Sequence, residues 1–170
     1  MMLDWIPVQE RLDLVADPVA RAVGEVDGVR VAEIDPTLAD TAAFCEKYGV
    51  ALADSANCVV VAGKRGGETR YAAVMVLATG RADVNGVIRR HLDVRKISFA
   101  PHDEAVSLTG MEYGGITPIG LPGDWPVLVD ETVTQRDFVV IGSGFRRSKL
   151  ALSGQALASI KNTELLALTL

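Results

Sequence analysis

The sequence predicts an α/β protein in which a curved, barrel-like mixed β-sheet is surrounded by helices. Runs rich in β-branched residues alternate irregularly with helical patterns, without the regular crossover spacing of a doubly wound sheet. The length of 170 residues, with 49% hydrophobic residues and no low-complexity tract, fits one globular domain. We therefore expect a single domain over residues 1–170, in which residues 1–28 form a helical extension packed on the rest.

The first third of the chain predicts two helices around one strand. A helix is expected from Asp17-Pro18, because aspartate caps helices and proline suits their first turn, and it should end at Asp27-Gly28. Alternating apolar residues over 29–34 predict a strand. A second helix should begin at Thr37, which approximates a capping box with the aspartate three positions later, and end at Gly49.

The middle of the chain predicts a β-hairpin followed by short elements. Residues 58–62 and 71–77 are β-rich runs joined by a glycine-containing turn. Both runs are apolar at consecutive positions, so the hairpin should be buried on both faces. Asp83 then caps a helix, a short strand is expected over 97–99, and Pro101 opens another short helix.

The last third predicts an ordered loop, three strands and a closing helix. Residues 114–126 are rich in glycine and proline but are interleaved with isoleucine, leucine and tryptophan, which a flexible tether would not need. Apolar strands are expected over 127–129, 138–141 and 149–152. A helix from Gln155 should close the chain.

Composition excludes several classes of function. The net charge of −5 and pI near 5.0 argue against non-specific binding to nucleic acid, although a local basic patch could bind one RNA end. The sequence has no apolar run of about 20 residues and no signal-peptide pattern at its start, so a cytoplasmic protein without a membrane partner is expected. Cys45 and Cys58 are expected to be reduced core residues, and no metal or other cofactor is predicted.

The stretch from Thr109 to Pro122 is the most informative for function. It contains four glycines and two prolines, and glycine allows close backbone approach while proline fixes the chain. Such a segment could form a rigid rim that presents the amides of Gly114 and Gly115 to a ligand oxygen. A tight connection between two strands is the alternative, and it is the commoner use of such clusters.

Short blocks in one order give the chain a resemblance to the YbaK family, also called the prolyl-tRNA-synthetase-associated or editing domain. The resemblance covers roughly residues 30–160 and therefore nearly the whole domain. The blocks that carry it are Thr41-Ala42, the strand Val59–Ala62, Asp83, Thr109-Gly110, Gly114-x-x-x-Pro118, Asp130 and Gly142-Ser143-Gly144.

The resemblance implies a YbaK-type fold and a trans-acting aminoacyl-tRNA deacylase. Such an enzyme cleaves the ester of a mischarged tRNA, with Ala- or Cys-tRNA(Pro) as family substrates, and uses no metal. It implies that backbone amides of the Gly-x-x-x-Pro loop bind the ester carbonyl, while a ribose hydroxyl of the tRNA activates water. The implied catalytic residues are Asn57, Gly114 and Thr117, and the implied substrate-binding residues are Gly110, Tyr113, Gly115, Ile116, Pro118, Asp130, Ser143 and Gly144.

Asn57 is the main departure from the family pattern, because it stands at the position of the family's catalytic lysine. An asparagine offers a neutral amide in place of a positive charge. It could orient water or the substrate amine, Lys64 or Arg65 could supply the charge, or Asn57 could simply cap a strand end. The alternative function is therefore a non-catalytic module that binds aminoacyl-tRNA or an aminoacyl ligand. A hydrolase of another small ester or amide is a third reading.

Basic and aromatic residues predict how tRNA would bind, with no DNA partner expected. Arg146, Arg147 and Lys149 could contact acceptor-stem phosphates, with Arg89, Arg90, Arg95 and Lys96 as a second cluster, although a solvated surface is the commoner role of each. Tyr113 or Phe145 could stack on the terminal base. Neither His91 nor His102 belongs to a recognisable nucleophile and base arrangement. The sequence leaves open a homodimer, the amino acid removed, and whether Asp130 binds substrate or caps a helix.

Overall fold

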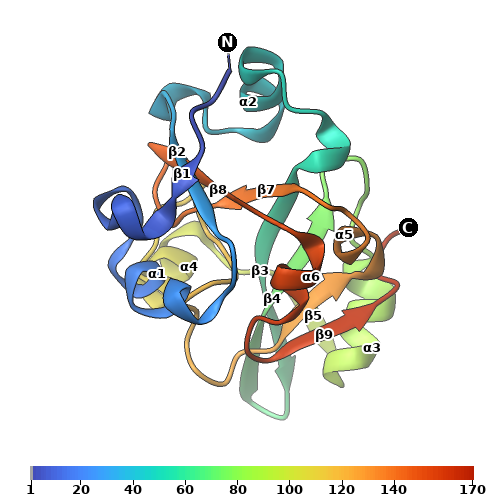
Figure 1. Cartoon of the computed structure of the whole chain (residues 1–170). Helices are drawn as coiled ribbons and strands as arrows, with labels where there is room; N and C mark the ends of the chain where they lie inside the picture. Colours follow the sequence, from blue (N-terminus) through green and yellow to red (C-terminus); the bar gives the residue numbers. More distant parts are fainter. Residues whose placement is uncertain (1) are drawn as a thin grey trace.

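Two β-sheets and six α-helices make up the computed structural model, which describes residues 2–170 (Figure 1). Sheet A has the strand order β1-β2-β8-β7 and sheet B has the order β5-β3-β4-β6-β9. The strands are β1 (Ile6–Pro7), β2 (Arg30–Glu33), β3 (Ala56–Arg65), β4 (Glu68–Leu77), β5 (Lys96–Phe99), β6 (Val127–Asp130), β7 (Val139–Gly142), β8 (Ser148–Leu152) and β9 (Thr163–Leu166).

The helices are short. The α-helices are α1 (Asp17–Ala22), α2 (Thr41–Tyr48), α3 (Arg89–Leu92), α4 (His102–Thr109), α5 (Glu131–Thr134) and α6 (Gly154–Ala158). The tighter or wider turns are η1 (Val8–Glu10), η2 (Leu12–Leu14), η3 (Val23–Glu25), η4 (Pro36–Leu38), η5 (Leu52–Asp54) and η6 (Val84–Ile88). Over residues 2–170, no helix has both the length and the apolar character that crossing a membrane requires.

Mixed strand pairing was predicted, and it is confirmed. Strands β3 and β4 are antiparallel, as are β3 and β5, whereas β4 and β6, and β6 and β9, are parallel. The expectation of a barrel-like sheet is wrong, because the strands in residues 2–170 form two separate sheets with open ends and no closed barrel. The two sheets meet at one corner, where Ser55, just before β3, forms an isolated bridge with Val140 of β7.

The β3–β4 hairpin has the predicted position and burial. Its ten-residue strands pair from Ala56 opposite Leu77 to Arg65 opposite Glu68, and the turn places Gly66 and Gly67 at positive φ. The hairpin reaches well beyond the other strands at the bottom of Figure 1. Its body is buried on both faces because separate hydrophobic clusters lie on the two sides of sheet B.

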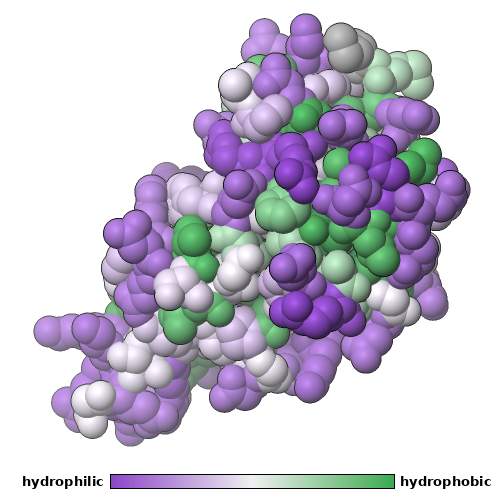
Figure 2. All heavy atoms as spheres, turned by 90° about the vertical axis from the view of Figure 1, so that its left-hand side faces the viewer, coloured by the Kyte–Doolittle hydropathy of each residue, from purple (hydrophilic) through white to green (hydrophobic). Residues whose placement is uncertain are grey.

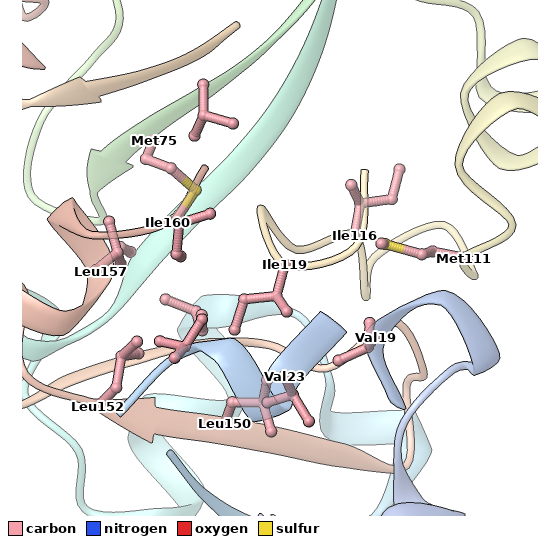
Figure 3. Packing of buried hydrophobic residues seen from close by; sticks show 14 of the residues in the cluster. Val19, Val23, Met75, Met111, Ile116, Ile119, Leu150, Leu152, Leu157 and Ile160 are labelled. Atoms are coloured by element: carbon pink, nitrogen blue, oxygen red, sulfur yellow. The ribbon is translucent and has the colours of Figure 1, made fainter. Parts of the chain in front are cut away.

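The larger hydrophobic cluster fills the space between the two sheets. Sheet A contributes Leu150 and Leu152, sheet B contributes Met75, and α1 contributes Val19 (Figure 3). The loop after α4 adds Ile119, whose burial supports the expectation that this glycine-rich segment is ordered. Full burial of each such side chain contributes roughly 1.5–3 kcal/mol to the stability of the fold. Because the members of the cluster come from the whole length of the chain, their burial holds distant segments together.

A second cluster covers the outer face of sheet B. Val61 and Val74 point to that side, opposite the face that packs on sheet A. They contact Ile88 of η6 and Leu92 of α3, which begin after the predicted cap at Asp83. The Asp83 carboxylate accepts from two backbone amides in η6, which explains why the chain turns into this helix there.

The second helix starts later than the capping pattern predicted. The Asp35 carboxylate accepts from the backbone amide of Thr37 at 2.9 Å and from its hydroxyl at 2.8 Å. Thr37 therefore donates inside η4, and α2 begins at Thr41 after its N-cap residue Asp40. The predicted end is confirmed, because Gly49 adopts the left-handed conformation with φ 69°.

The chain does not close on a helix. Helix α6 ends at Ala158, and strand β9 follows and pairs in parallel with β6. The turn between them places Asn162 at φ 67°, and the Asn162 amide donates to the Gly123 carbonyl at 2.8 Å. The β-rich run after Asn162 thus completes sheet B instead of extending the helix.

The N-terminal segment packs on the sheets. Val8, Leu14 and Val19 are buried in the larger cluster, and β1 pairs with β2. Helix α1 begins one residue earlier than predicted, since Ala16 is its N-cap and Asp17 lies in the first turn. The segment is held in place by apolar burial and by strand pairing.

Candidate functional site

A cavity of about 470 Å³ lies at the corner where the two sheets meet. Its walls come from the start of α2, the first half of β3, the start of α4, the loop after α4, and strands β7 and β8. Predicted site residues from both halves of the chain line it, including Asn57, Gly114 and Ile116. The fold therefore gathers, in one cavity, positions that are more than fifty residues apart in sequence.

Asn57 lies on β3 with its side chain held in one orientation. The Thr41 hydroxyl donates to the Asn57 side-chain oxygen at 2.6 Å. Thr41 is available for this bond because α2 begins at that residue. Within residues 2–170 the Asn57 amide nitrogen has no acceptor, so it remains as a neutral donor to a ligand in the cavity.

Lys149 is buried in the same cavity, although the sequence grouped it with arginines expected to contact RNA phosphates. Only 8% of its surface is exposed, and its Nζ donates to the Ala39 carbonyl at 2.9 Å and lies 5.3 Å from the centre of the Phe44 ring. Burial, with a smaller contribution from the charge of Arg146, lowers the pKa of Lys149 to about 8. The clue in the sequence was the apolar run 150–152 directly after this lysine.

The glycine rim offers different amides from the pair that the sequence predicted. Gly114 is at φ +86°, and its amide has no acceptor in the described residues. The Gly115 amide, in contrast, donates to the Glu112 carbonyl at 3.0 Å. Ile116 also lines the cavity and has an amide without an acceptor over residues 2–170. Gly114 and Ile116 are therefore the rim amides that remain free for a ligand oxygen.

Aromatic side chains surround the mouth of the cavity. Tyr113 stacks on His102, with ring centroids 3.6 Å apart and an angle of 21° between the rings. Tyr113 is 50% exposed, and Phe99 on the same cavity wall is 60% exposed. The sequence assigned His102 no role, and it missed this contact because Tyr113 and His102 come from different segments. Exposed aromatic rings beside a cavity suit a flat, partly apolar ligand group.

Arg146 extends across the rim, whereas Arg147 turns away from it. The Arg146 side chain lies 3.6 Å from the Asp40 carboxylate and occupies the space that a Cβ on Gly114 would need. Arg147 donates to the Asp13 carbonyl at 2.7 Å and lies over the Phe145 ring. The predicted RNA-binding residues are therefore divided between the cavity mouth, the N-terminal segment and the cavity interior.

Three other predicted substrate-binding residues lie outside the cavity lining and determine the local conformation of the backbone. Gly110 is at φ 69° and ends α4. The Ser143 hydroxyl bonds the Ser148 hydroxyl at 2.6 Å and so closes the turn between β7 and β8. Gly144 lies close to Ala16, where a larger residue would not fit.

Asp130, Thr117 and Pro118 also lie outside the cavity lining. The Asp130 carboxylate accepts from the Thr132 amide at 3.3 Å and from the Leu168 amide at 2.8 Å, which is the capping alternative that the sequence left open. Thr117 is fully buried, and its hydroxyl has no hydrogen-bond partner in residues 2–170. Pro118 is buried beside it.

The alternative cations Lys64 and Arg65 lie at the far end of the hairpin and do not line the cavity. Arg65 pairs with Asp93. Lys64 borders a second, more open hollow of about 640 Å³, together with Arg89, Arg95 and Lys96. This hollow is called the basic groove below. Strand β5 connects the groove to Phe99 at the cavity mouth.

The cavity is suited to binding an oxygen that carries negative charge. The Asn57 amide, the Lys149 ammonium and the Gly114 amide are nitrogen donors along its walls. Cys58 also lines it, but burial raises the pKa of this thiol to about 12, so it stays protonated at neutral pH and is a poor nucleophile. Among residues 2–170, no group of three histidine, cysteine, aspartate or glutamate side chains could hold a metal ion.

Comparison with known proteins matches the part of the chain that forms this cavity to a described family. The profile of the aminoacyl-tRNA editing domain matches residues 35–160, a range that contains every cavity residue named above. Proline–tRNA ligases from Lactobacillus gasseri and Lactobacillus johnsonii are 41% and 40% identical to the chain over 73 residues. These matches cover 41% of the chain but only 13% of each ligase, so the chain corresponds to a small part of those enzymes.

Solved structures share the fold. One, described as a candidate trans-editing enzyme for prolyl tRNA synthetase, has a TM-score of 0.77 and 19% identity and covers 90% of this chain and 95% of its own. Another, described as a hypothetical protein, has a TM-score of 0.74 and 22% identity and covers 84% of this chain and 91% of its own. At these identities the similarity concerns the arrangement of helices and strands.

Proposed function

We propose, since the chain belongs to the aminoacyl-tRNA editing domain family, that it is a trans-acting deacylase that hydrolyses the ester of a mischarged aminoacyl-tRNA. The observation that carries the proposal is the cavity at the corner of the two sheets. It combines free amide donors of Asn57 and the Gly114 rim, within the matched residues. An aminoacyl ester presents a carbonyl oxygen that such donors can bind.

The proposed chemistry needs donors from the protein and a base from the substrate. Water attacks the ester carbonyl carbon, the bond to the ribose oxygen breaks, and that oxygen takes a proton, which releases the amino acid and the tRNA. The Gly114 amide donates to the carbonyl oxygen, where one preorganised donor contributes about 3 kcal/mol to transition-state stability. A neighbouring ribose hydroxyl activates the water, in keeping with the protonated state of Cys58.

The proposed substrates are tRNA(Pro) species that carry alanine or cysteine. Sequence identity of 41% to part of a proline–tRNA ligase supports the link to proline decoding. The cavity walls include Val60, Ile116 and Ile141, which favour an aminoacyl side chain that is small and uncharged. The predicted residues outside the cavity lining would then stabilise the conformation of the segments around the site without touching the substrate. They are Thr117, Pro118, Gly110, Asp130, Ser143 and Gly144.

The proposed contacts to RNA lie around the cavity mouth. The stacked Tyr113 and His102 rings can stack on the terminal adenine, as single-stranded RNA ends are commonly bound. Arg146 at the rim can meet the phosphate that precedes this base. The cavity mouth then contacts the end of the acceptor stem, and such local binding agrees with a chain that is acidic as a whole.

The test is a panel of charged tRNAs. The purified chain is incubated with Ala-tRNA(Pro), Cys-tRNA(Pro) and correctly charged Pro-tRNA(Pro), and the remaining esterified amino acid is measured over time. We expect one mischarged species to be lost faster than in buffer and Pro-tRNA(Pro) to be spared. If every ester survives as long as in buffer while an active family deacylase clears its own substrate, the catalytic proposal is wrong.

A non-catalytic binding module is the second candidate, and the neutral side chain at position 57 favours it. The Asn57→Lys and Asn57→Ala variants separate the two functions. If Asn57→Lys creates hydrolysis where the natural chain has none, the natural protein is a binder. If Asn57→Ala removes existing turnover, Asn57 belongs to a working site.

A further inference from the structure

Lys149 is a buried cation that no anion of the protein neutralises. All five residues of β8 are buried, and only 8% of the surface of Lys149 is exposed. Over residues 2–170, no carboxylate oxygen lies within 4.0 Å of its Nζ, and the Ala39 carbonyl is its one hydrogen-bond acceptor. A buried charge without a partner is costly to folding, and such a cost is commonly retained where the charge has a function.

Lys149 lines the cavity and has N–H donors that no protein group accepts in residues 2–170. An ammonium has three N–H groups, and the Ala39 carbonyl accepts one of them. Lys149 lines the same cavity as Asn57, but it arrives from sheet A while Asn57 arrives from sheet B. Both sides of the corner thus contribute a nitrogen donor to one space.

Gly142 connects the lysine to the glycine rim. It is the residue opposite Lys149 in the pairing of β7 with β8. A Cβ on Gly142 would lie 2.6 Å from the Gly115 carbonyl oxygen and 2.7 Å from that of Ile116, so the β7 backbone packs directly on the rim. The strand that carries Lys149 is therefore one strand away from the amides proposed to hold the ester.

We propose that Lys149 is a catalytic residue of the deacylation, which donates from its ammonium to the ester carbonyl oxygen and stabilises the negative charge that forms there. This rests on the proposed function. As water adds to the carbonyl carbon, the carbonyl electron pair moves to the oxygen that Lys149 contacts. When the pair returns, the bond to the ribose oxygen breaks and that oxygen takes a proton. Lys149 keeps its proton throughout, so it acts as a fixed cation and not as a base.

The ionisation of Lys149 predicts how the rate of hydrolysis should depend on pH. Burial and the charge of Arg146 lower its pKa to about 8, while Asp40 and Cys45 oppose that shift. The other titratable groups along the cavity are Asp40, Cys58, His102 and Tyr113. Since the protonated form is the active one, kcat/KM should fall as pH rises through about 8. A guanidinium stays charged over this range, so Lys149→Arg should move that fall to higher pH.

The experiment compares four variants with the wild type on the mischarged tRNA that the wild type hydrolyses. Lys149→Met keeps an unbranched side chain that is one atom shorter and removes its charge, and we expect it to lower kcat by about 100-fold. Lys149→Arg should retain part of the activity with the altered pH profile. Lys149→Met combined with Asn57→Lys returns a cation to the cavity from β3 and should recover part of the loss. Lys47→Met, at an exposed lysine on α2 away from the cavity, should match the wild type.

The outcomes separate the inference from the proposed function. A wild type that hydrolyses no ester overturns both. An active wild type with an equally active Lys149→Met variant overturns only the role of Lys149. Activity that rises through pH 8 contradicts a fixed cation and identifies a base instead. If circular dichroism shows that Lys149→Met is unfolded, the Lys149→Arg profile decides, because a fall that stays at about pH 8 in that variant assigns the ionisation to another group.

Discussion

A single hydrogen bond determines which end of the Asn57 amide a ligand meets. The Thr41 hydroxyl occupies the amide oxygen at 2.6 Å, so the nitrogen is the end left for the cavity. The cavity therefore offers donors from three directions, with Lys149 on β8 and Gly114 on the rim as the others. A site lined mainly by donors binds a carbonyl or an anionic oxygen better than it binds an amine.

The rim depends on glycine at position 114, and Gly114→Ala tests this. Its φ of +86° is unfavourable for alanine, and a Cβ would collide with the Arg146 side chain. We expect a loss of about 1–2 kcal/mol in the free energy of unfolding and a large loss of deacylation. Thermal melts and ester hydrolysis measure the two effects.

Gly123→Ala is the matched control for this change. Gly123 lies in the same loop, and a Cβ there would have no heavy atom within 4 Å. It should leave activity and melting temperature near the wild-type values. Equal losses in both variants would mean that the loop tolerates no side chain anywhere, and the special role of Gly114 would be lost.

Lys149→Met should raise the stability of the folded chain at pH 7. The pKa of Lys149 is lowered from 10.5 to about 8, so at pH 7 the folded state carries the full cost of a buried charge, about 3 kcal/mol. Between pH 8 and 10.5 the unfolded chain binds more protons than the folded one, so wild-type stability gains relative to the variant as pH rises. Urea unfolding of both proteins at pH 7 and pH 10 measures this, and a difference that does not shrink with pH would contradict it.

The residues of the site were only partly predictable. Asn57, Gly114, Tyr113 and Ile116 were identified from the blocks that resemble the family, and all four line the cavity. The burial of Lys149 in the cavity was missed because a pattern of neighbouring charges, Arg146-Arg147-x-Lys149, looks like an exposed basic patch. Lys149 differs from the two arginines because it lies on a buried strand. Whether a strand is buried on both faces depends on partners that are distant in sequence.

At the scale of elements, local signals predicted most strands and some helix boundaries, whereas α1 ends at Ala22 before the predicted Asp27-Gly28 and α2 begins at Thr41 after the predicted Thr37. The hairpin, the left-handed glycine at the end of α2 and the aspartate cap at η6 all depend on neighbours in sequence. Strand β9 was missed because its pairing partner, β6, lies more than thirty residues earlier. The separation into two sheets was missed for the same reason, since β2 pairs with β8 across more than a hundred residues.

Strand β5 should guide RNA from the basic groove to the cavity mouth. Arg95 and Lys96 lie at its start, and Phe99 at its end lines the cavity. Replacing both basic residues by glutamate should raise KM for aminoacyl-tRNA severalfold and weaken the salt dependence of binding. The hydrolysis of a minimal ester, an aminoacyl-adenosine, should not change because it lacks the acceptor stem.

A matched control for this prediction reverses charges away from β5. Arg21 and Arg30 are both exposed and lie on α1 and β2, outside the basic groove. The Arg21→Glu and Arg30→Glu double variant changes the net charge equally. If it raises KM as much as the β5 variant does, the effect reflects total charge and β5 has no guiding role.

The whole molecule should unfold in one step. The cluster between the sheets joins α1, β4, β8 and α6, so removing any of these exposes the others. We propose that residues 1–170 form one domain that includes the N-terminal extension. Trp5 packs edge-on against Phe138 and Trp125 stacks on Tyr71, so the two indoles report on opposite parts of the chain.

Two variants make this measurable by fluorescence. Trp5→Phe leaves only Trp125 as an emitter, and Trp125→Phe leaves only Trp5. Denaturation midpoints from each indole should coincide with the midpoint from circular dichroism of the same variant. Midpoints that separate between the two probes would divide the chain into independent units.

One face of the molecule carries apolar patches among polar side chains. Figure 2 shows hydrophobic side chains gathered in patches that hydrophilic ones border, over the face that lies to the left in Figure 1. Exposed aromatic side chains at the cavity mouth belong to Phe99 and Tyr113. Apolar exposure at a rim beside a hollow is typical of ligand sites, whereas scattered exposed side chains need no explanation.

The bridge between Ser55 and Val140 makes the site dependent on both sheets at once. Asn57 follows this bridge on β3, and Gly142 follows it on β7. A change in how the two strands pair at the bridge would therefore separate the hydrogen-bond donors of the cavity from one another. Ester hydrolysis should consequently report whether the two sheets have joined correctly. A collapsed folding intermediate with nearly native circular dichroism would stay inactive until the bridge between Ser55 and Val140 forms.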